Sequence, residues 1–364
     1  MTGSNVKTQG FQRLLESSVG FALCQLDSEK VILFSGTYSA EKAPDFTRAQ
    51  LFAPDFYRSA DKPWLNFETV EVLSLTELED WARKQLKSGS EIQWDEPSFS
   101  DFSSQVNRIE AAFNAHELHK AVPTVFATSK RSETDPSVVQ MLARSVFNRG
   151  ERMLYALVLE DQGMIGATPE TLFDFDLENN ITSMALAGTR ATEAEASDPL
   201  LSDSKEIHEH NLVLFEIKEK LQAFGEVESG LTDTWNIGTL THLRTDITVK
   251  PSEQKKPEVL FTYLEKALHP TPALGVASET LNFTWLKDLP GAKPRYRFGA
   301  PFGVWHPELG AKVFVAIRNI QWTEDEWILG SGCGYVPASK VDKEWKELEL
   351  KRASVKALFE RAND

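Results

Sequence analysis

The fold is decided by one stretch, LYALVLEDQGMIGATPETLFDFDLENNITSMALAG, which spans residues 154–188. Its short apolar runs are separated by Asp161-Gln162-Gly163 and by Glu178-Asn179-Asn180, and polar triplets of this kind are typical of hairpin turns. Similar runs flank residues 27–29, and KVFVAIRNIQW (312–322) precedes a turn at 323–326. The pattern predicts antiparallel strands joined by hairpins.

Helical periodicity appears in two longer segments outside these hairpins. Apolar side chains recur three, four and seven residues apart over residues 203–224, and a similar stripe runs along residues 340–360. Shorter helices are predicted over residues 75–88, 106–118, 135–148 and 257–267. Hairpin strands with interspersed helices indicate an α+β protein with large antiparallel sheets and argue against a doubly wound fold.

Composition excludes several classes of protein. The chain has 364 residues, with 39 Lys and Arg against 54 Asp and Glu, so its net charge is −15. Its length exceeds the roughly 250 residues at which a single core usually stops growing, which predicts one large two-lobed domain or two packed ones. With 41% hydrophobic residues it is neither disordered nor a coiled coil. Because no block of Lys and Arg is present, nucleic acid and anionic membranes are not expected as partners.

The sequence shows no membrane span and no export signal. No apolar run approaches the roughly 18 residues that a span needs, and the start of the chain has no cationic segment before a hydrophobic one. Cys24 and Cys333 are more than 300 residues apart, without a C-x-x-C pattern, which predicts reduced thiols. We therefore expect a cytoplasmic protein. The polar segment 88–105 is interpreted as a surface connection between an N-terminal lobe and the rest.

Several familiar motifs fail on inspection. Residues 330–334, Gly-Ser-Gly-Cys-Gly, lack the spacing and the strand-to-helix context of a dinucleotide site. His208-Glu209-His210 does not form H-E-x-x-H, and residues one or two apart on a helix do not share a face. Neither G-x-S-x-G nor a P-loop occurs. These motifs therefore give no support for a zinc protease, a serine hydrolase or a P-loop protein.

Two pairs of glutamates remain as candidates for chemistry. Glu206 and Glu209 are three residues apart and lie on one face of the helix predicted at 203–224. Glu344 and Glu347 repeat this spacing in the last predicted helix. If the two faces met, four carboxylates would converge, and hard oxygen ligands without His or Cys favour Mg²⁺.

Ordinary structural roles also explain each pair well when it is taken alone. Asp203 and Glu206 fit a helix cap, and Glu347 with Lys351 fits an exposed ion pair one helical turn apart. Spacing alone leaves both interpretations open.

The motifs around these glutamates resemble a known family. In chain order they are GATPETLF (166–173), LAGTR (186–190), SKEIHEHNLV (204–213), THL (241–243), LHPTPALG (268–275), VAIR (315–318), GSGCGYVPAS (330–339) and EWKELELK (344–351). Together they resemble the chorismate-utilising enzymes, which include isochorismate, salicylate, anthranilate and aminodeoxychorismate synthases.

The resemblance implies a fold and a domain organisation. It implies an α/β sandwich in which two large antiparallel sheets pack face to face with helices outside. It also implies a single chorismate-binding catalytic domain over residues 1–364, with the motifs in residues 105–360. Residues 1–100 add little to the resemblance and are expected to form a divergent N-terminal lobe.

A few positions indicate the branch of the family. Lys120 resembles the lysine base of the water-adding enzymes, where the ammonia-adding enzymes carry glutamine. It precedes Glu170 of the GATPE motif by 50 residues, which fits the isochorismate synthases. Ala187 stands where aminodeoxychorismate synthases have a nucleophilic lysine. Ammonia chemistry is therefore not expected.

Three further positions distinguish isochorismate from salicylate synthases. Ala273, Leu274 and Phe298 match the former, whereas the latter tend to carry Thr and Tyr in place of Ala273 and Phe298. The resemblance therefore implies an isochorismate synthase, in which water adds at C2 of chorismate while the C4 hydroxyl leaves. Its product would feed menaquinone or siderophore biosynthesis.

The resemblance also assigns the acid, the base and the cation. Lys120 is expected to be the general base on the attacking water, for which it must not be tightly ion-paired, and Glu170 the general acid that protonates the leaving hydroxyl. The expected cofactor, Mg²⁺, would bind the ring carboxylate of the substrate. Its expected direct or water-bridged ligands are Glu209 and Glu347, with Glu206 and Glu344 as supporting carboxylates.

The remaining assigned residues would hold the substrate. Arg318, on a predicted strand, is suited to a bidentate grip on the enolpyruvyl carboxylate, and Gly332 and Gly334 allow backbone N–H groups to approach it. Lys351 is expected to neutralise the metal-site carboxylates, and His242 to orient the ring or the water. A strand-surface salt bridge, a simple turn and a buried structural histidine are the ordinary alternatives for Arg318, the glycines and His242.

Two other functions are weighed against isochorismate synthase. A salicylate synthase would also remove pyruvate from isochorismate, and a chorismate-binding paralogue would bind without turnover. The branch positions oppose the first, and the presence of Lys120, Glu170, Glu209 and Glu347 opposes the second. No amidotransferase subunit is expected as a partner, and the oligomeric state is left open.

Overall fold

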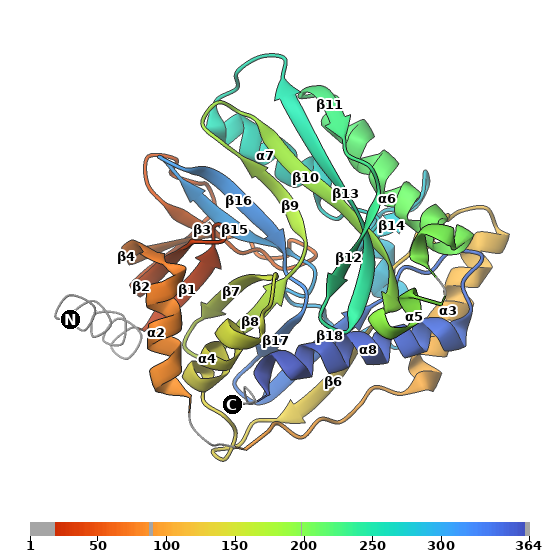
Figure 1. Cartoon of the computed structure of the whole chain (residues 1–364), viewed down its shortest axis with the longest axis horizontal. Helices are drawn as coiled ribbons and strands as arrows, with labels where there is room; N and C mark the ends of the chain where they lie inside the picture. Colours follow the sequence, from red (N-terminus) through yellow and green to blue (C-terminus); the bar gives the residue numbers. More distant parts are fainter. Residues whose placement is uncertain (1–18, 87–89, 198, 361–364) are drawn as a thin grey trace.

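Antiparallel strands form most of the scaffold (Figure 1). The computed structural model describes residues 19–86, 90–197 and 199–360. Its strands are β1 (Gly20–Gln25), β2 (Lys30–Glu41), β3 (Gln50–Phe52), β4 (Trp64–Ser74), β5 (Lys120–Ala121), β6 (Thr124–Lys130), β7 (Met153–Val158), β8 (Gly163–Thr168), β9 (Thr171–Phe175), β10 (Ile181–Ala191), β11 (Gly225–Ser229), β12 (Asp233–Ile237), β13 (Leu240–Pro251), β14 (Val276–Ala277), β15 (Pro301–His306), β16 (Gly310–Val315), β17 (Asn319–Trp322) and β18 (Glu326–Gly332).

Hydrogen bonds join nearly all of these strands into one sheet. The sheet has 16 strands in the order β11-β13-β10-β9-β16-β15-β3-β4-β2-β1-β7-β8-β17-β18-β6, with β12 paired to β13, while β14 and β5 pair separately. Strands β1 to β4 lie in the middle of this order, so the described part of the first hundred residues belongs to the same sheet. The predicted antiparallel α+β class is confirmed. The two layers of the predicted sandwich are halves of one continuous sheet.

The alternation of side chains explains why the halves pack face to face. In β1, Phe21 and Leu23 contact a core that also contains helices, whereas Ala22 and Cys24 contact a second core built from strands and the residues next to their ends, without helices. In this second core the rings of Tyr155 and Phe302 are 5.3 Å apart between centroids. These residues lie on β7 and β15, which four other strands separate in the sheet order. The sheet therefore folds back on itself around an apolar interior.

All six predicted helices are present, although residues 87 and 88 of the first lie outside the described residues. The helices are α2 (Leu75–Gln85), α3 (Phe99–Asn114), α4 (Val138–Asn148), α5 (Thr192–Glu195), α6 (Ser204–Leu221), α7 (Pro257–Leu268) and α8 (Val341–Phe359), with 3-10 turns at Leu200–Ser202 and Phe283–Asp288. Helix α3 begins at Phe99 rather than at residue 106, because Ser98 caps it by accepting hydrogen bonds from two backbone N–H groups.

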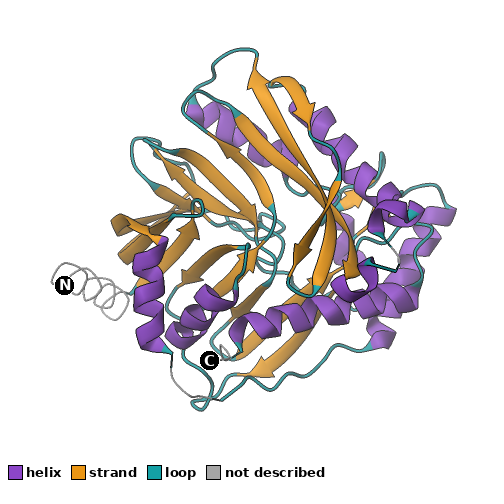
Figure 2. Cartoon of the chain, viewed as in Figure 1, coloured by secondary structure: helices purple, strands orange, loops and turns teal. Residues whose placement is uncertain are grey.

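The helices lie outside the sheet (Figure 2). Helices α2, α4 and α8 share a core with β1, β7, β8 and β18, whereas α6 and α7 share one with β9, β10, β13 and β16. Each half of the sandwich therefore has its own helical cover, and α6 and α8 come from different halves.

Two predictions from composition can be compared with the structure. Among the helices of the described residues, none has the length and apolar character needed to cross a bilayer. Cys24 and Cys333 are both buried free thiols, as predicted.

The segment predicted as one strand at 312–322 is broken. Strand β16 ends at Val315 and β17 begins at Asn319, so the prediction that Arg318 lies on a strand is wrong. Arg318 has a backbone φ of 57°, in the left-handed region that interrupts a strand. This break directs the side chain at the centre of the site described next.

Candidate active site

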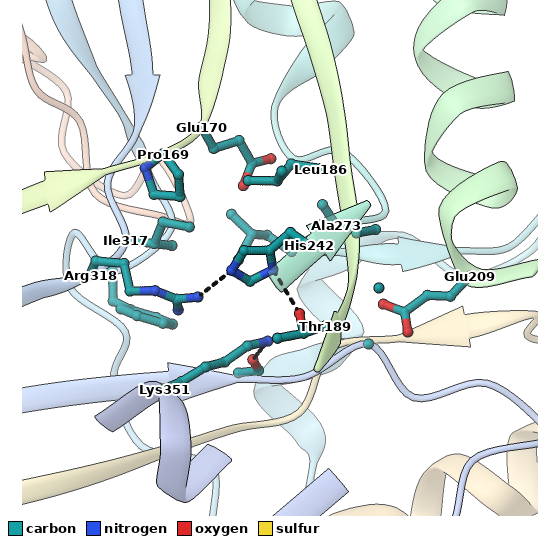
Figure 3. Close-up of a pocket in the computed structure, with 16 residues that line it drawn as sticks. Pro169, Glu170, Leu186, Thr189, Glu209, His242, Ala273, Ile317, Arg318 and Lys351 are labelled. Atoms are coloured by element: carbon teal, nitrogen blue, oxygen red, sulfur yellow. Dashed lines mark hydrogen bonds between the residues drawn. The ribbon is translucent and has the colours of Figure 1, made fainter. Parts of the chain in front are cut away.

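Most of the predicted substrate and catalytic residues line one small cavity (Figure 3). The cavity has a volume of about 50 Å³. It is lined by ten of the residues selected from the sequence: Glu170, Glu209, His242, Ala273, Leu274, Phe298, Arg318, Gly332, Gly334 and Lys351. These residues come from segments that are up to 181 positions apart in the chain, so only the fold brings them together.

Backbone hydrogen bonds hold the GATPE and VAIR motifs side by side. The N–H of Val315 donates to the carbonyl of Glu170 over 3.0 Å, and the N–H of Ala167 donates to the carbonyl of Arg318 over 3.2 Å. Thr168 Oγ1 donates to the carbonyl of Val315 and accepts from the N–H of Glu170. Glu170 and Arg318 are thus fixed at the same edge of the cavity.

A buried polar network supports the unusual backbone of Arg318. Tyr155 Oη donates to the carbonyl of Ile317 over 2.8 Å, and Asn319 Nδ2 donates to Tyr155 Oη over 2.8 Å. Both side chains are fully buried. A Cβ at Gly166 would come within 2.7 Å of each of them, so glycine is required there for close approach. The network therefore fixes the turn that aims the guanidinium into the cavity.

A stability measurement tests this backbone strain. Arg318→Gly should be more stable than Arg318→Ala by about 1 kcal/mol, because only glycine adopts a positive φ without steric cost. Urea unfolding of the two variants checks the order, and both lose the guanidinium, so its contribution cancels. An alanine variant at least as stable as the glycine variant would contradict the assignment of strain.

The general-acid candidate Glu170 is buried in this cavity. Burial raises the pKa of its carboxyl to about 7, although Lys120, Arg318 and Lys351 oppose the shift. A carboxyl with this pKa can hold a proton near neutral pH and deliver it to a leaving group. Glu170 is therefore not an exposed turn residue.

His242 links Arg318 to Thr189, which the sequence analysis did not select. Burial, and then the nearby Arg318, lower the pKa of the His242 imidazole well below its usual value, so the ring is neutral. Its Nε2 lies 3.4 Å from Arg318 Nη2 and its Nδ1 lies 2.9 Å from Thr189 Oγ1. A guanidinium only donates, so Nε2 accepts and Nδ1–H donates to Thr189. His242 is buried, as expected of a structural histidine, and it also lines the cavity.

Lys120 occupies a different position from the one expected of a free base. It is fully buried on β5, which excludes a solvated surface lysine. Its Nζ lies 3.0 Å from Glu209 Oε1, so the expectation that it is not tightly ion-paired is wrong. The physical reason is the close approach at Gly334, where a Cβ would overlap both Glu209 Oε1 and Lys120 Cε. Gly334 thus permits this pair, a role separate from the predicted N–H contact with substrate.

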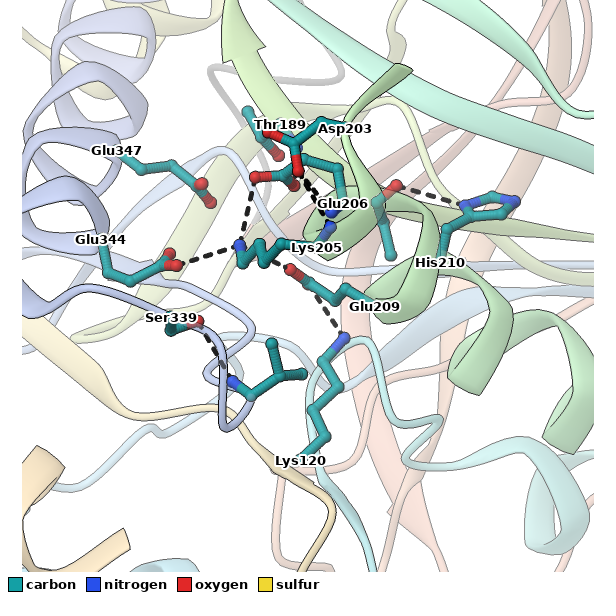
Figure 4. Close-up of polar contacts among 12 residues, drawn as sticks. Lys120, Thr189, Asp203, Lys205, Glu206, Glu209, His210, Ser339, Glu344 and Glu347 are labelled. Atoms are coloured by element: carbon teal, nitrogen blue, oxygen red, sulfur yellow. Dashed lines mark hydrogen bonds and ion pairs between the residues drawn. The ribbon is translucent and has the colours of Figure 1, made fainter. Parts of the chain in front are cut away.

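The four glutamates of α6 and α8 face one another beside this pair (Figure 4). A lysine that the sequence analysis passed over, Lys205, stands between three of them. Its Nζ lies 2.9 Å from Glu344 Oε1, 3.1 Å from Glu209 Oε2 and 3.2 Å from Glu206 Oε1. The available signal was its position four residues before Glu209 on one helix face.

The pKa values of these carboxyls reflect the electrostatic cost of placing several carboxylates close together. Burial and the other carboxylates raise the pKa of Glu206 and of Glu344 to about 7. The pKa of Glu209 is lowered to about 2, because the ammonium groups of Lys120 and Lys205 outweigh the effect of its burial. A cation where these side chains meet therefore relieves their repulsion.

The four carboxylates are suitable ligands for a hard divalent cation, but they are not positioned to coordinate one. In residues 19–86, 90–197 and 199–360 no three acidic, His or Cys side chains stand close enough to hold a metal as they are. Carboxylate oxygens are among the ligands that Mg²⁺ prefers, and the mutual repulsion of these carboxylates is relieved at present by Lys205. The residues fit Mg²⁺ in chemistry, and binding requires that they rearrange.

Lys351 connects this cluster to the cavity. Its Nζ lies 2.6 Å from Glu347 Oε1 and also donates to the carbonyl of Gly332 over 2.9 Å. The ion pair one helical turn apart is present, but its side chains are only 12% and 14% exposed, so the interpretation as an exposed pair is wrong. Gly332 therefore offers its carbonyl to Lys351, which places the ammonium at the cavity wall. At the start of α6, Asp203 accepts from the N–H groups of Lys205 and Glu206, so the predicted cap is also present.

Comparison with known proteins identifies proteins that are similar to this chain in sequence and in fold. A sequence profile of the family described as chorismate binding enzyme matches residues 56–359. The isochorismate synthase EntC of Escherichia coli (strain K12) is 32% identical over 275 residues, which cover 72% of this chain and 68% of that protein. The salicylate biosynthesis isochorismate synthase of Pseudomonas aeruginosa is 28% identical over 240 residues, which cover 63% of this chain and 48% of that protein.

The chain therefore matches about half the length of the Pseudomonas relative. Among solved structures, DhbC from Bacillus anthracis is similar with a TM-score of 0.76 at 19% identity, and the match covers 95% of this chain and 99% of DhbC. At this identity the likeness supports the fold.

Proposed function

We propose that this chain, which belongs to the family of chorismate binding enzymes, is an isochorismate synthase. The observation that carries the proposal is Glu170, a buried carboxyl with a pKa raised to about 7 in a cavity that also presents Arg318 and Lys351. An acid beside cationic groups suits a dianionic substrate that must lose a hydroxyl. The relatives named above support the same activity.

The acid and the base divide the reaction between them. Glu170 protonates the C4 hydroxyl as it leaves, and Lys120 takes the proton from the water that adds at C2. Because Lys120 contacts Glu209 at 3.0 Å, this ion pair has to open, and Nζ has to be unprotonated, before it can take a proton from the water. The neutral ring of His242 orients Arg318 and does not compete for either proton.

The cationic groups bind and orient the substrate. Arg318 and Lys351 meet its enolpyruvyl carboxylate from the cavity wall, and the buried walls formed by Leu274 and Phe298 exclude bulk water. Mg²⁺ held by Glu209 and Glu347, with Glu206 and Glu344 in support, would neutralise the ring carboxylate. Since water is the nucleophile, the proposal requires no amidotransferase subunit.

Analysis of products tests the proposed function directly. Purified protein incubated with chorismate and Mg²⁺ should form isochorismate alone, identified by chromatography against standards. Formation of salicylate with pyruvate would instead establish a salicylate synthase, and the absence of any conversion would establish binding without turnover. A parallel incubation in EDTA should show no conversion.

A further inference from the structure

Lys205 holds the position that a bound cation would need. Its ammonium contacts carboxylates from both helices, Glu206 and Glu209 on α6 and Glu344 on α8, over 2.9 to 3.2 Å (Figure 4). It is therefore the internal cation of the cluster in this structure.

We propose that Lys205 competes with the divalent metal for these carboxylates and leaves them when the metal binds, so that it sets the metal affinity of the site. The inference rests on the proposed function, which supplies the metal site. It adds a residue that neither the motif assignments nor the spacing of the glutamates identified.

The two cations would share a ligand. Mg²⁺ binds carboxylate oxygens at about 2.1 Å and Nζ of Lys205 lies 3.1 Å from Glu209 Oε2, so an ion bound to that oxygen would lie within about 5.2 Å of the present Nζ position. Two cations at that separation repel strongly in a buried site, and the ammonium and the ion would compete for the same oxygen lone pairs. Lys205 must therefore move for the metal to bind.

An adjoining cavity offers the displaced side chain a place. This second cavity has a volume of about 640 Å³ and is lined by Lys205, Glu206, Glu344 and Glu347 on the side facing the carboxylates. The side chain of Lys205 is already 16% exposed. Rotation about its flexible stem can therefore carry the ammonium from the carboxylates into the larger cavity without moving α6.

Chemical labelling of the amine tests displacement without measuring activity. The protein is treated with sulfosuccinimidyl acetate in EDTA or in saturating Mg²⁺, without chorismate, and acetylation of Lys205 is followed by mass spectrometry. The rate at Lys205 should rise roughly tenfold or more with Mg²⁺, because an ammonium held by three carboxylates resists modification. Lys312, which is paired with Asp174 over 2.6 Å on β16, serves as the matched control and should not change.

A variant gives a second, independent readout. Lys205→Met keeps the length of the side chain and removes the competing charge, so its Mg²⁺ dissociation constant by calorimetry should fall roughly tenfold or more. In EDTA the same variant should melt at a lower temperature than the parent, and Mg²⁺ should restore the difference. Unchanged or weaker Mg²⁺ binding by Lys205→Met would overturn the inference.

The outcomes separate this inference from the proposed function. If the parent protein binds Mg²⁺ and forms isochorismate while labelling of Lys205 stays constant, the inference fails and the function stands. If calorimetry detects no Mg²⁺ binding to the parent, both the metal site and the competition are overturned.

Discussion

Lys120→Ala should lower kcat for the conversion of chorismate to isochorismate by roughly 10²- to 10⁴-fold, the usual contribution of a general base. Binding of chorismate in the presence of Mg²⁺ should persist, because the cationic groups that meet the substrate carboxylates, Arg318 and Lys351, are unchanged. The variant should also fold, since Glu209 keeps its second ion pair with Lys205 over 3.1 Å. Steady-state kinetics and calorimetric titration with chorismate measure the two effects separately.

Two companion variants sharpen this prediction. Lys120→Met preserves the volume of the buried side chain and should be as inactive as the alanine variant, so a cavity cannot account for the loss. Lys130→Ala, on the adjacent strand β6 and exposed, should retain full activity. An active Lys120→Met variant would contradict the assignment of Lys120 as the base.

The fold was largely predictable because its hairpins are local. The turns at 161–163 and 178–180 join strands that pair directly with each other, and the short apolar runs that build β1 and β7 are visible over a few residues. The continuity of the sheet was not predictable. It depends on pairing between distant strands, such as β15 with β3 and β1 with β7, which no local pattern encodes.

The conformation of Arg318 shows where local pattern was misleading. Residues 312–322 have the composition of an uninterrupted strand, yet the chain turns at Arg318. The groups that hold the turn, Tyr155 and Asn319, are 164 residues apart, so their contact is a property of the packed sheet. A non-glycine residue at positive φ is one of the conformations that propensity predicts least well.

The charged residues of α6 and α8 could also be predicted only in part. Spacing placed Glu206 with Glu209 and Glu344 with Glu347 on two helix faces, and the structure brings those faces together. The spacing of the glutamates did not indicate that Lys205 would bridge the two helices, nor that Lys120 would pair with Glu209. Both contacts depend on the approach of α6, α8 and the chain around Gly334, which is set by tertiary packing.

The pH dependence of the reaction provides the second large prediction. With a pKa of about 7, Glu170 carries its proton below neutral pH and loses it above, so the part of kcat/KM that depends on Glu170 should fall as the pH rises through about 7. The groups that face it, Lys120, Arg318 and Lys351, limit how far burial raises this pKa. His242 is already neutral and adds no titration near pH 7.

Glu170→Gln should remove both the acid and its titration. The amide has the shape of the carboxyl but no acidic proton, so kcat should fall by roughly 10²- to 10⁴-fold, and the residual rate should lose the decline centred near pH 7. Glu178→Gln, exposed in the turn between β9 and β10, is the matched control and should keep the parent profile. If the Glu170→Gln variant still showed that decline, another group would carry the titration, and Glu170 would not be the general acid.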